Sequence, residues 1–120
     1  MTKVLIIDDN LDVGEILKIY LEYNKIDVDL VDDNIKILEI YKNDPYKYEY
    51  VFIDYMMNTM DGFSLLNELY KINPSINAYI CSGRTLSKKI KNNVKVYGFI
   101  QKPFNIDDVN KIIKTWEDKN

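Results

Sequence analysis

Val4-Leu5-Ile6-Ile7-Asp8-Asp9 and Tyr50-Val51-Phe52-Ile53-Asp54 are the two stretches that decide the fold of this chain. Each is an unbroken apolar run that ends abruptly in aspartate. A short apolar run of this kind predicts a strand that is buried on both faces, as in a parallel sheet covered by helices on both sides. The same two runs predict carboxylates at the points where the strands leave the core.

The rest of the chain alternates between strand-like and helix-like patterns. Residues 27–31, 76–81 and 96–100 are predicted strands, and the first of them is expected to be more exposed because its polar and apolar residues alternate. Apolar residues spaced three or four positions apart predict five helices. These are residues 12–24, a helix around residues 37–41 that ends before Pro45, one from Asp61-Gly62 to before Pro74, a weaker one through Leu86, Ile90 and Val94, and a last one capped by Asn105.

The first and last helices have the clearest apolar stripes. Asp12 and Glu15 have the spacing of a capping box at the start of the first helix. Its predicted buried stripe is Val13, Ile16, Leu17, Tyr20 and Leu21, and that of the last helix is Val109, Ile112, Ile113 and Trp116.

Five strands thus alternate with five helices, without a linker or an internal repeat. This pattern predicts an α/β fold with a single five-stranded parallel sheet, helices on both faces and right-handed crossovers. A chain of 120 residues is long enough for one compact domain and too short for two.

Composition excludes several kinds of chemistry. The chain has no histidine, which excludes histidine-based triads and histidine-ligated zinc, and one cysteine, Cys81, which excludes an internal disulfide. We expect Cys81 to be a small buried hydrophobic residue. The formal net charge of −3 disfavours direct nucleic-acid binding by the whole molecule. No apolar run is long enough to span a membrane and no secretory signal is recognisable, so we expect a cytoplasmic protein without a membrane partner.

Polar residues follow four of the five predicted strands. Because the carboxyl ends of parallel strands meet at one edge of the sheet, these side chains are expected to converge there. They are Asp8 and Asp9 after the first strand, Asp54 after the third, Ser82 after the fourth and Lys102 after the fifth.

Three neighbouring carboxylates need counter-charge, or some of them must stay protonated, since each pair at about 4 Å costs on the order of 4 kcal/mol at an effective dielectric constant of about 20. Oxygen ligands suit Mg²⁺, and one Mg²⁺ together with Lys102 neutralises the three acids. Such a site tolerates an incoming phosphoryl group, to which Ser82 can donate a hydrogen bond. The remaining carboxylate can then act as a nucleophile and form an acyl phosphate.

In order and spacing, these residues resemble the receiver domain of two-component response regulators. The motifs are Asp8-Asp9, the stretch from Asp54 to Asp61-Gly62, Ser82-Gly83, and Lys102-Pro103-Phe104. The resemblance covers essentially the whole chain, residues 1–120, as one receiver domain without an output domain. It implies the flavodoxin-like strand order 2-1-3-4-5.

The resemblance also implies roles for the site residues. Asp54 would be the phosphoacceptor, with a phosphohistidine of a sensor histidine kinase or phosphotransfer protein as donor. Asp9 and Asp54 would ligate Mg²⁺ together with the backbone carbonyl of Met56, and Asp8 would act through water. Lys102 would contact the phosphoryl group.

Signalling is implied to depend on a switch. Ser82 would bind a phosphoryl oxygen and pull the following loop inward, and Phe99 would then swing inward and alter the face formed by the fourth helix, fifth strand and fifth helix. Met56 and Arg84 would flank the phosphoryl group. Asn58 stands where the family usually has proline, which predicts a less rigid loop.

The implied partners are the kinase or phosphotransfer protein, a downstream effector or an output domain outside this chain, and a second copy in a phosphorylation-dependent homodimer. The protein is not expected to be an enzyme beyond its own phosphorylation and dephosphorylation. The alternative is a receiver-like interaction platform that is not phosphorylated. A flavodoxin is disfavoured because Asp8-Asp9-Asn10 replaces its phosphate-binding loop, and an aspartate-dependent phosphatase because the spacing of its two aspartates is absent.

Two further groups of residues were singled out. Lysines cluster around the fourth helix, either as a solvated face or as a docking patch for an acidic partner: Lys88, Lys89, Lys91 and Lys95. Three alternating tyrosines before the third strand predict packing at its edge: Tyr46, Tyr48 and Tyr50.

Overall fold

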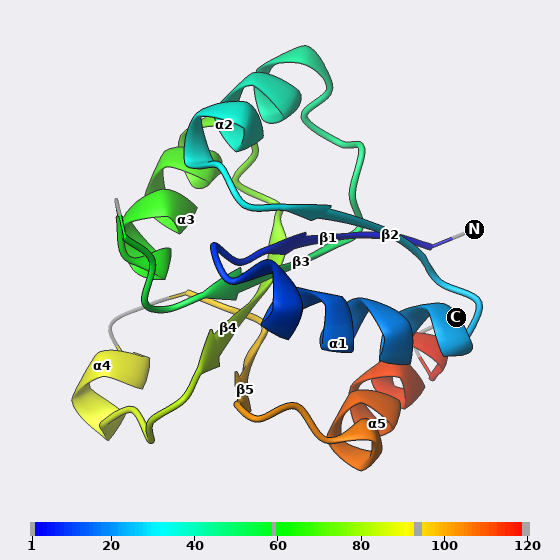
Figure 1. The fold of residues 1–120 in the computed structure, drawn as a ribbon. Helices are drawn as coiled ribbons and strands as arrows, with labels where there is room; N and C mark the ends of the chain where they lie inside the picture. The colour runs from blue at the N-terminus through cyan, green and yellow to red at the C-terminus, as the bar shows by residue number, and fades with distance from the viewer. Residues whose placement is uncertain (1, 59, 93–94, 119–120) are drawn as a thin grey trace.

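The computed structural model describes residues 2–58, 60–92 and 95–118. In chain order it has five strands and five helices, which alternate throughout (Figure 1). The strands are β1 (Lys3–Ile7), β2 (Asp27–Val31), β3 (Tyr50–Asp54), β4 (Asn77–Ser82) and β5 (Gly98–Gln101). The helices are α1 (Leu11–Tyr23), α2 (Asn34–Asn43), α3 (Gly62–Ile72), α4 (Lys88–Asn92) and α5 (Ile106–Glu117).

All five strands are parallel and lie in the order β2-β1-β3-β4-β5, as predicted. Helices α1 and α5 cover one face of the sheet, whereas α2 and α3 cover the other (Figure 1). The order places β3 at the centre, between β1 and β4. The carboxyl end of β3 is therefore the middle of the edge at which a ligand site is expected.

Alternation along the central strands explains why their sequences are continuously apolar. Val4 and Ile6 of β1 pack beneath α1 and α5, whereas Leu5 and Ile7 pack beneath α2 and α3. All four are buried, because helices cover both faces of the sheet. At the outer edge, β2 is less buried, as its alternating pattern predicts.

Two details of α1 differ from the prediction. The N-cap of α1 is Asn10, whose side chain accepts a hydrogen bond from the Val13 N–H, so the capping box assigned to Asp12 was wrong. The acidic Asp12 lies in the first turn of the helix instead. Ile16, assigned to the buried stripe, is 43% exposed, because it lies on the side of α1 away from the sheet.

The region around α4 also differs. The helix begins at Lys88, so Leu86 precedes it and is buried in the loop, while Val94 lies outside the described residues. Strand β5 begins at Gly98 rather than residue 96, since pairing with β4 starts only there. At α5, by contrast, Asn105 is the N-cap as predicted and accepts a hydrogen bond from the Asp107 N–H.

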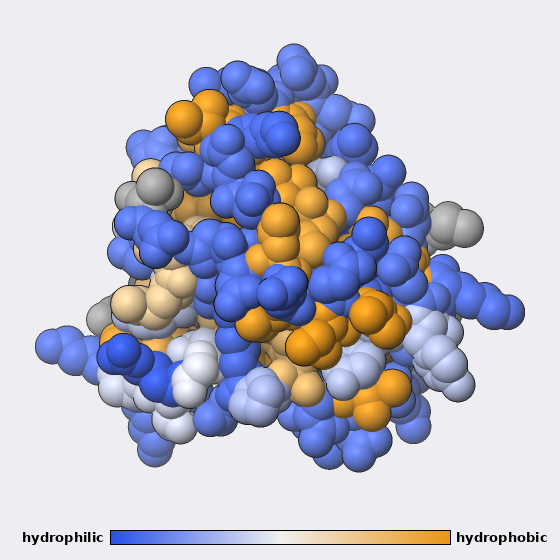
Figure 2. Space-filling model, viewed as in Figure 1, coloured by the Kyte–Doolittle hydropathy of each residue, from blue (hydrophilic) through white to orange (hydrophobic). Residues whose placement is uncertain are grey.

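The remaining predictions about packing are mostly confirmed. Cys81 is a buried free cysteine, and burial raises the pKa of its thiol. Tyr48 and Tyr50 are buried, whereas Tyr46 is 75% exposed and contributes no packing of this kind. The surface carries a few apolar groups among mainly hydrophilic ones, including several over α1 (Figure 2). Within the described ranges, no helix has both the length and the apolar character that crossing a membrane requires.

Candidate functional site

The polar residues predicted to converge do so at the carboxyl edge of the sheet. Asp54 is the last residue of β3 and Ser82 the last of β4, while Asp8 and Lys102 come directly after β1 and β5. Parallel pairing aligns these strand ends, since Asp54 is in register with Cys81 and Ser82 with Gln101. Residues far apart along the chain therefore meet because of the strand order.

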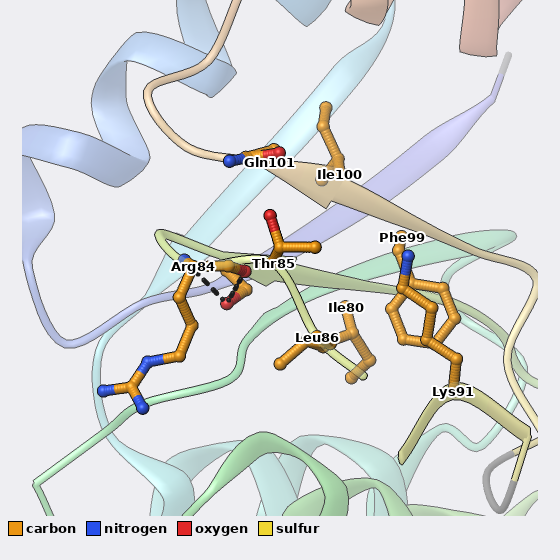
Figure 3. A pocket seen from close by; sticks show the side chains of 9 residues that line it. Ile80, Arg84, Thr85, Leu86, Lys91, Phe99, Ile100 and Gln101 are labelled. Carbon is orange, nitrogen blue, oxygen red and sulfur yellow. Dashed lines mark hydrogen bonds between the residues drawn. The ribbon is translucent and has the colours of Figure 1, made fainter. Parts of the chain in front are cut away.

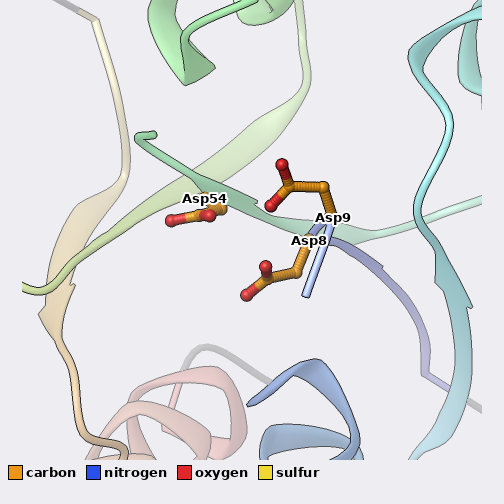
Figure 4. Close-up of side chains that lie close together, drawn as sticks. All are labelled: Asp8, Asp9 and Asp54. Carbon is orange, nitrogen blue, oxygen red and sulfur yellow. The ribbon is translucent and has the colours of Figure 1, made fainter. Parts of the chain in front are cut away.

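Three carboxylates lie together at the centre of this edge (Figure 4). Asp8, Asp9 and Asp54 each offer an oxygen atom, and these atoms all lie within 4.8 Å of one another. Asp8 and Asp54 are buried, with 2% and 7% of their surface exposed, whereas Asp9 is partly open to solvent. Burial of like charges at this separation is unfavourable unless cations compensate for them.

Lys102 supplies one compensating charge. Its Nζ lies 2.9 Å from Oδ2 of Asp8 and 3.0 Å from Oδ1 of Asp54, so a single ammonium bridges two carboxylates. Burial acts to lower the pKa of Lys102, but its hydrogen bonds and ion pairs with the two aspartates outweigh this effect and raise the pKa. Lys102 therefore remains a cation.

The negative charge of Asp54 is only partly compensated by its neighbours. Burial raises the pKa of its carboxyl group, and the nearby charge of Asp8 raises it further. The hydrogen bonds from Lys102 and from the backbone of Met56 oppose this shift without cancelling it. The ionised form of Asp54 is thus held at a cost in free energy, which an additional cation would reduce.

Backbone amides hold the other two carboxylates. Asp8 Oδ1 accepts a hydrogen bond of 2.9 Å from the Asn10 N–H, and Asp9 Oδ2 accepts one of 2.9 Å from the Asn58 N–H. Asn58 is the residue that departs from the family pattern. A proline at this position would have no N–H to donate, so the substitution adds a direct link between the β3–α3 loop and Asp9.

Ser82 is held by the loop that follows it. Its hydroxyl donates to the backbone carbonyl of Arg84 at 2.9 Å and accepts from the Arg84 N–H at 3.2 Å. A serine hydroxyl has one proton to donate. Ser82 can therefore donate to a ligand only by releasing the Arg84 carbonyl, which couples ligand contact at Ser82 to the position of the β4–α4 loop.

An open pocket of about 500 Å³ gives access to these groups. Met56 lies at its edge with 57% of its surface exposed, and the exposed Arg84 lines it from the opposite loop. The lining residues are Asp9, Asn10, Asp54, Met56, Ser82, Gly83, Arg84 and Lys102. The structure thus brings together every predicted site residue except Phe99.

Phe99 lies on β5, in register with Ile80 of β4, and is half-buried. Its ring lines a separate cavity beside the β4–α4 loop, and the ammonium of Lys91 lies 5.4 Å from the ring centroid (Figure 3). Ser82 and Arg84 line the same cavity. The loop that holds the Ser82 hydroxyl is therefore in contact with the space beside the Phe99 ring.

Gly62 is a site residue whose role could not be predicted from the motif. A Cβ atom at this position would lie 2.5 Å from the backbone carbonyl oxygen of Asp54 and 3.2 Å from its carbonyl carbon. The Gly62 N–H donates a 2.8 Å hydrogen bond to the Tyr55 carbonyl, which draws the start of α3 against the end of β3. The φ angle of Gly62 is not in the left-handed region. Glycine is therefore needed at this position for the close approach to the Asp54 backbone and not for its conformational freedom.

The donor set fits a magnesium ion. Mg²⁺ prefers oxygen ligands and usually binds one or two carboxylates together with water. The three clustered carboxylates have one ammonium among them, and Asp9 is open to the pocket. A divalent cation would therefore relieve the remaining repulsion.

Comparison with known proteins agrees with this geometry. Residues 4–114 match the family model of the response regulator receiver domain. The chain belongs to this family. A transcriptional regulatory protein, the CpxR homolog of Haemophilus influenzae, is 27% identical over 106 residues, which cover 88% of this receiver domain and 45% of that protein.

Solved structures support the same fold. A CheY-like response regulator receiver domain protein from Methanospirillum hungatei has a TM-score of 0.84 at 22% identity, with 99% of this chain and 95% of that one covered. A two-component response regulator from Clostridium difficile has a TM-score of 0.81 at 25% identity, with 96% and 94% covered. The chain spans about half the length of most curated relatives that it matches.

The contact between Gly62 and the Asp54 backbone predicts an effect on stability. Gly62→Ala should lower the free energy of unfolding by about 1–3 kcal/mol, because the methyl group meets backbone that cannot move without shifting Asp54. The measurement is urea denaturation followed by circular dichroism.

Gly83→Ala is the matched control, since a Cβ there meets no atom within 4 Å and the residue lines the pocket beside Asp54. Its stability should match that of the parent protein. Helix propensity alone would make Gly62→Ala more stable than the parent by up to about 1 kcal/mol. A Gly62→Ala protein that is as stable as the parent, or more stable, would therefore contradict the close approach between Gly62 and the Asp54 backbone.

Proposed function

We infer that this chain is a single receiver domain that acts as a phosphorylation-controlled switch in the cytoplasm. Asp54 accepts a phosphoryl group from a phosphohistidine of a sensor kinase or phosphotransfer protein, in a reaction that depends on Mg²⁺. The carrying observation is the buried Asp54 carboxylate, which lies beside two further carboxylates and within 3.0 Å of Lys102. These 120 residues contain no histidine, so the phosphohistidine donor lies outside them.

The reaction proposed at Asp54 is a direct phosphoryl transfer. A carboxylate oxygen of Asp54 attacks phosphorus, the new O–P bond forms as the donor's N–P bond breaks, and the imidazole leaves and takes up a proton from solvent. Lys102 is positioned by Asp8 to neutralise a phosphoryl oxygen, and Ser82 donates a hydrogen bond to another.

Asp8, Asp9, Asp54 and the backbone carbonyl of Met56 are the groups proposed to hold the metal, with Asp8 acting through water. When bound, Mg²⁺ would stabilise the negative charge that accumulates on the transferred group. The chain's own residues orient the nucleophile, since the Asp54 carboxylate is fixed between the Lys102 ammonium and the Met56 amide. We propose no further enzymatic activity beyond self-phosphorylation and dephosphorylation.

The signal is proposed to leave through the face formed by α4, β5 and α5. Phosphorylation would draw the Ser82 hydroxyl away from the Arg84 carbonyl and move the β4–α4 loop, after which the Phe99 ring could turn into the cavity beside it. Phe99 has no hydroxyl, so its position depends on packing and on the Lys91 ammonium alone. The downstream target of this signal is an effector protein, an output domain outside this chain, or a second copy of the chain.

Phosphorylation is tested by intact mass after incubation with Mg²⁺ and acetyl phosphate. One base-labile phosphoryl group should add to the protein, because Asp54 is the buried nucleophile. The adduct should be absent from Asp54→Asn and present in Asp61→Asn, an exposed aspartate that caps α3. A folded protein that takes no phosphoryl group from acetyl phosphate or from any phosphohistidine donor would favour the non-phosphorylated platform instead.

Metal binding should stabilise the fold. At a Mg²⁺ concentration of 100 times the Kd, linkage raises the free energy of unfolding by about 2.7 kcal/mol, or Tm on the order of 10 °C. Asp9→Asn should remove most of this increase, whereas Asp12→Asn, an exposed aspartate on α1, should keep it. Differential scanning fluorimetry with and without Mg²⁺ provides the measurement, and an equal increase in all three proteins would exclude the proposed ligand set.

The lifetime of the phosphoryl group depends on residue 56. Methionine does not orient an attacking water by hydrogen bonding, so the phosphoaspartate should decay slowly for this family. A hydrogen bond of about 1 kcal/mol from Met56→Asn should speed hydrolysis about fivefold. Met56→Leu, which adds no hydrogen bond, serves as the control. Decay is followed by loss of the mass adduct, and an unchanged or slower rate in Met56→Asn would refute the idea.

A further inference from the structure

The charges of this chain are strongly segregated. Residues 69–106 contain seven basic residues and no acidic one, whereas the other 82 residues contain nine basic residues and all nineteen acidic ones. This segment forms β4, α4 and β5, at one side of the sheet, and β2 lies at the opposite edge. A protein with a net charge of −3 therefore has one basic side.

Two of the seven cations are compensated. Lys102 pairs with Asp8 and Asp54, and Lys71 pairs with Glu68. The other five are exposed and, among the residues that the structure describes, form no ion pair: Arg84, Lys88, Lys89, Lys91 and Lys95. We call these five residues the basic rim.

Two residues of the basic rim, Arg84 and Lys91, line a cavity whose walls are partly apolar and partly polar. The cavity has a volume of about 130 Å³ and lies between the β4–α4 loop and β5 (Figure 3). Its apolar walls are Ile80, Leu86, Phe99 and Ile100, while Arg84 and Lys91 of the basic rim line it as well. A volume of about 150 Å³ is enough for a benzene molecule, so this cavity has room for a single apolar side chain against its apolar wall.

The neighbouring hollow on the other side of β5 has a different character. It has a volume of about 320 Å³ and is lined by both Asp108 and Lys111. Its charges are mixed, so it offers no net attraction for an anion. The charged residues that line the cavity on the α4 side, Arg84 and Lys91, are both cations.

We propose that the cavity and its basic rim form a docking groove for an acidic peptide segment of the effector, which inserts one apolar side chain between Leu86 and Phe99. This assignment rests on the proposed function, because it names the partner of the α4–β5–α5 face. Carboxylates on either side of the apolar residue meet the lysines of the basic rim, and the complementary charges set the register. A nucleic acid fits less well, since it would match the cations but leave the apolar wall of the cavity without a partner.

The groove also determines the direction of regulation. The inserted side chain and an inward Phe99 ring would occupy the same 130 Å³. The two are mutually exclusive, so the acidic segment binds the unphosphorylated domain and is released when the ring turns inward.

The probe is a short fluorescent peptide with one leucine flanked by glutamates and aspartates, and binding is measured by fluorescence anisotropy in the absence of any phosphodonor. Lys88→Glu combined with Lys95→Glu should weaken binding about tenfold. Lys36→Glu combined with Lys42→Glu makes the same charge change on exposed lysines of α2 and should leave binding unchanged. Serine in place of the peptide's leucine should also weaken binding about tenfold, and Mg²⁺ with beryllofluoride should weaken it to a similar extent.

Several results would overturn the proposal. They are no binding of the peptide, equal weakening by the α2 control, no effect of replacing the leucine, and tighter binding of a single-stranded oligonucleotide of equal charge. Because the first measurements use no phosphodonor, they remain informative if Asp54 takes up no phosphoryl group. In that case the proposed function fails, while peptide binding that depends on the basic rim still supports the groove.

Discussion

The ion pairs of Lys102 are the interaction on which this site depends. One ammonium reaches two buried carboxylates that come from different strands, and it does so at the centre of the sheet edge. Without it, Asp8 and Asp54 would be like charges in a poorly solvated place, which is costly. With it, the site still carries more negative than positive charge. This imbalance contributes to the raised pKa of Asp54 and creates the demand for a divalent cation.

The same arrangement joins the acidic pocket to the cavity beside Phe99 through short-range contacts. Ser82 belongs at once to the acidic pocket and to the β4–α4 loop, because its hydroxyl is bonded to the Arg84 backbone. The loop in turn lines the cavity beside Phe99. A change in the hydrogen bonding of one hydroxyl can therefore reach the α4–β5–α5 face without a long chain of intermediates. The basic rim beside that cavity gives the face a chemical character of its own.

Much of the fold could be predicted because both of its repeating patterns are local. Continuous apolar runs in β1 and β3 and the helical spacing in α5 were sufficient to identify those elements. The errors occurred where several local solutions have similar energies. Asn10 and Asp12 can both cap a helix, and only the path of the chain after Asp9 selects Asn10. Leu86 has helical spacing relative to Ile90 and was therefore predicted to lie in the fourth helix. The helix begins only at Lys88, and Leu86 is buried in the loop before it.

The sequence by itself determined the family, the strand order and the identity of Asp8, Asp9, Asp54, Ser82 and Lys102 as the candidate site, because motif order and residue chemistry are properties of the chain. Only the tertiary structure decided how these residues are connected. In the tertiary structure Lys102 forms ion pairs with two carboxylates, and the Asn58 N–H donates a hydrogen bond to Asp9. The close approach of the Asp54 backbone requires glycine at position 62. Such contacts depend on distances of a few ångströms between residues far apart in sequence, and no local pattern encodes them.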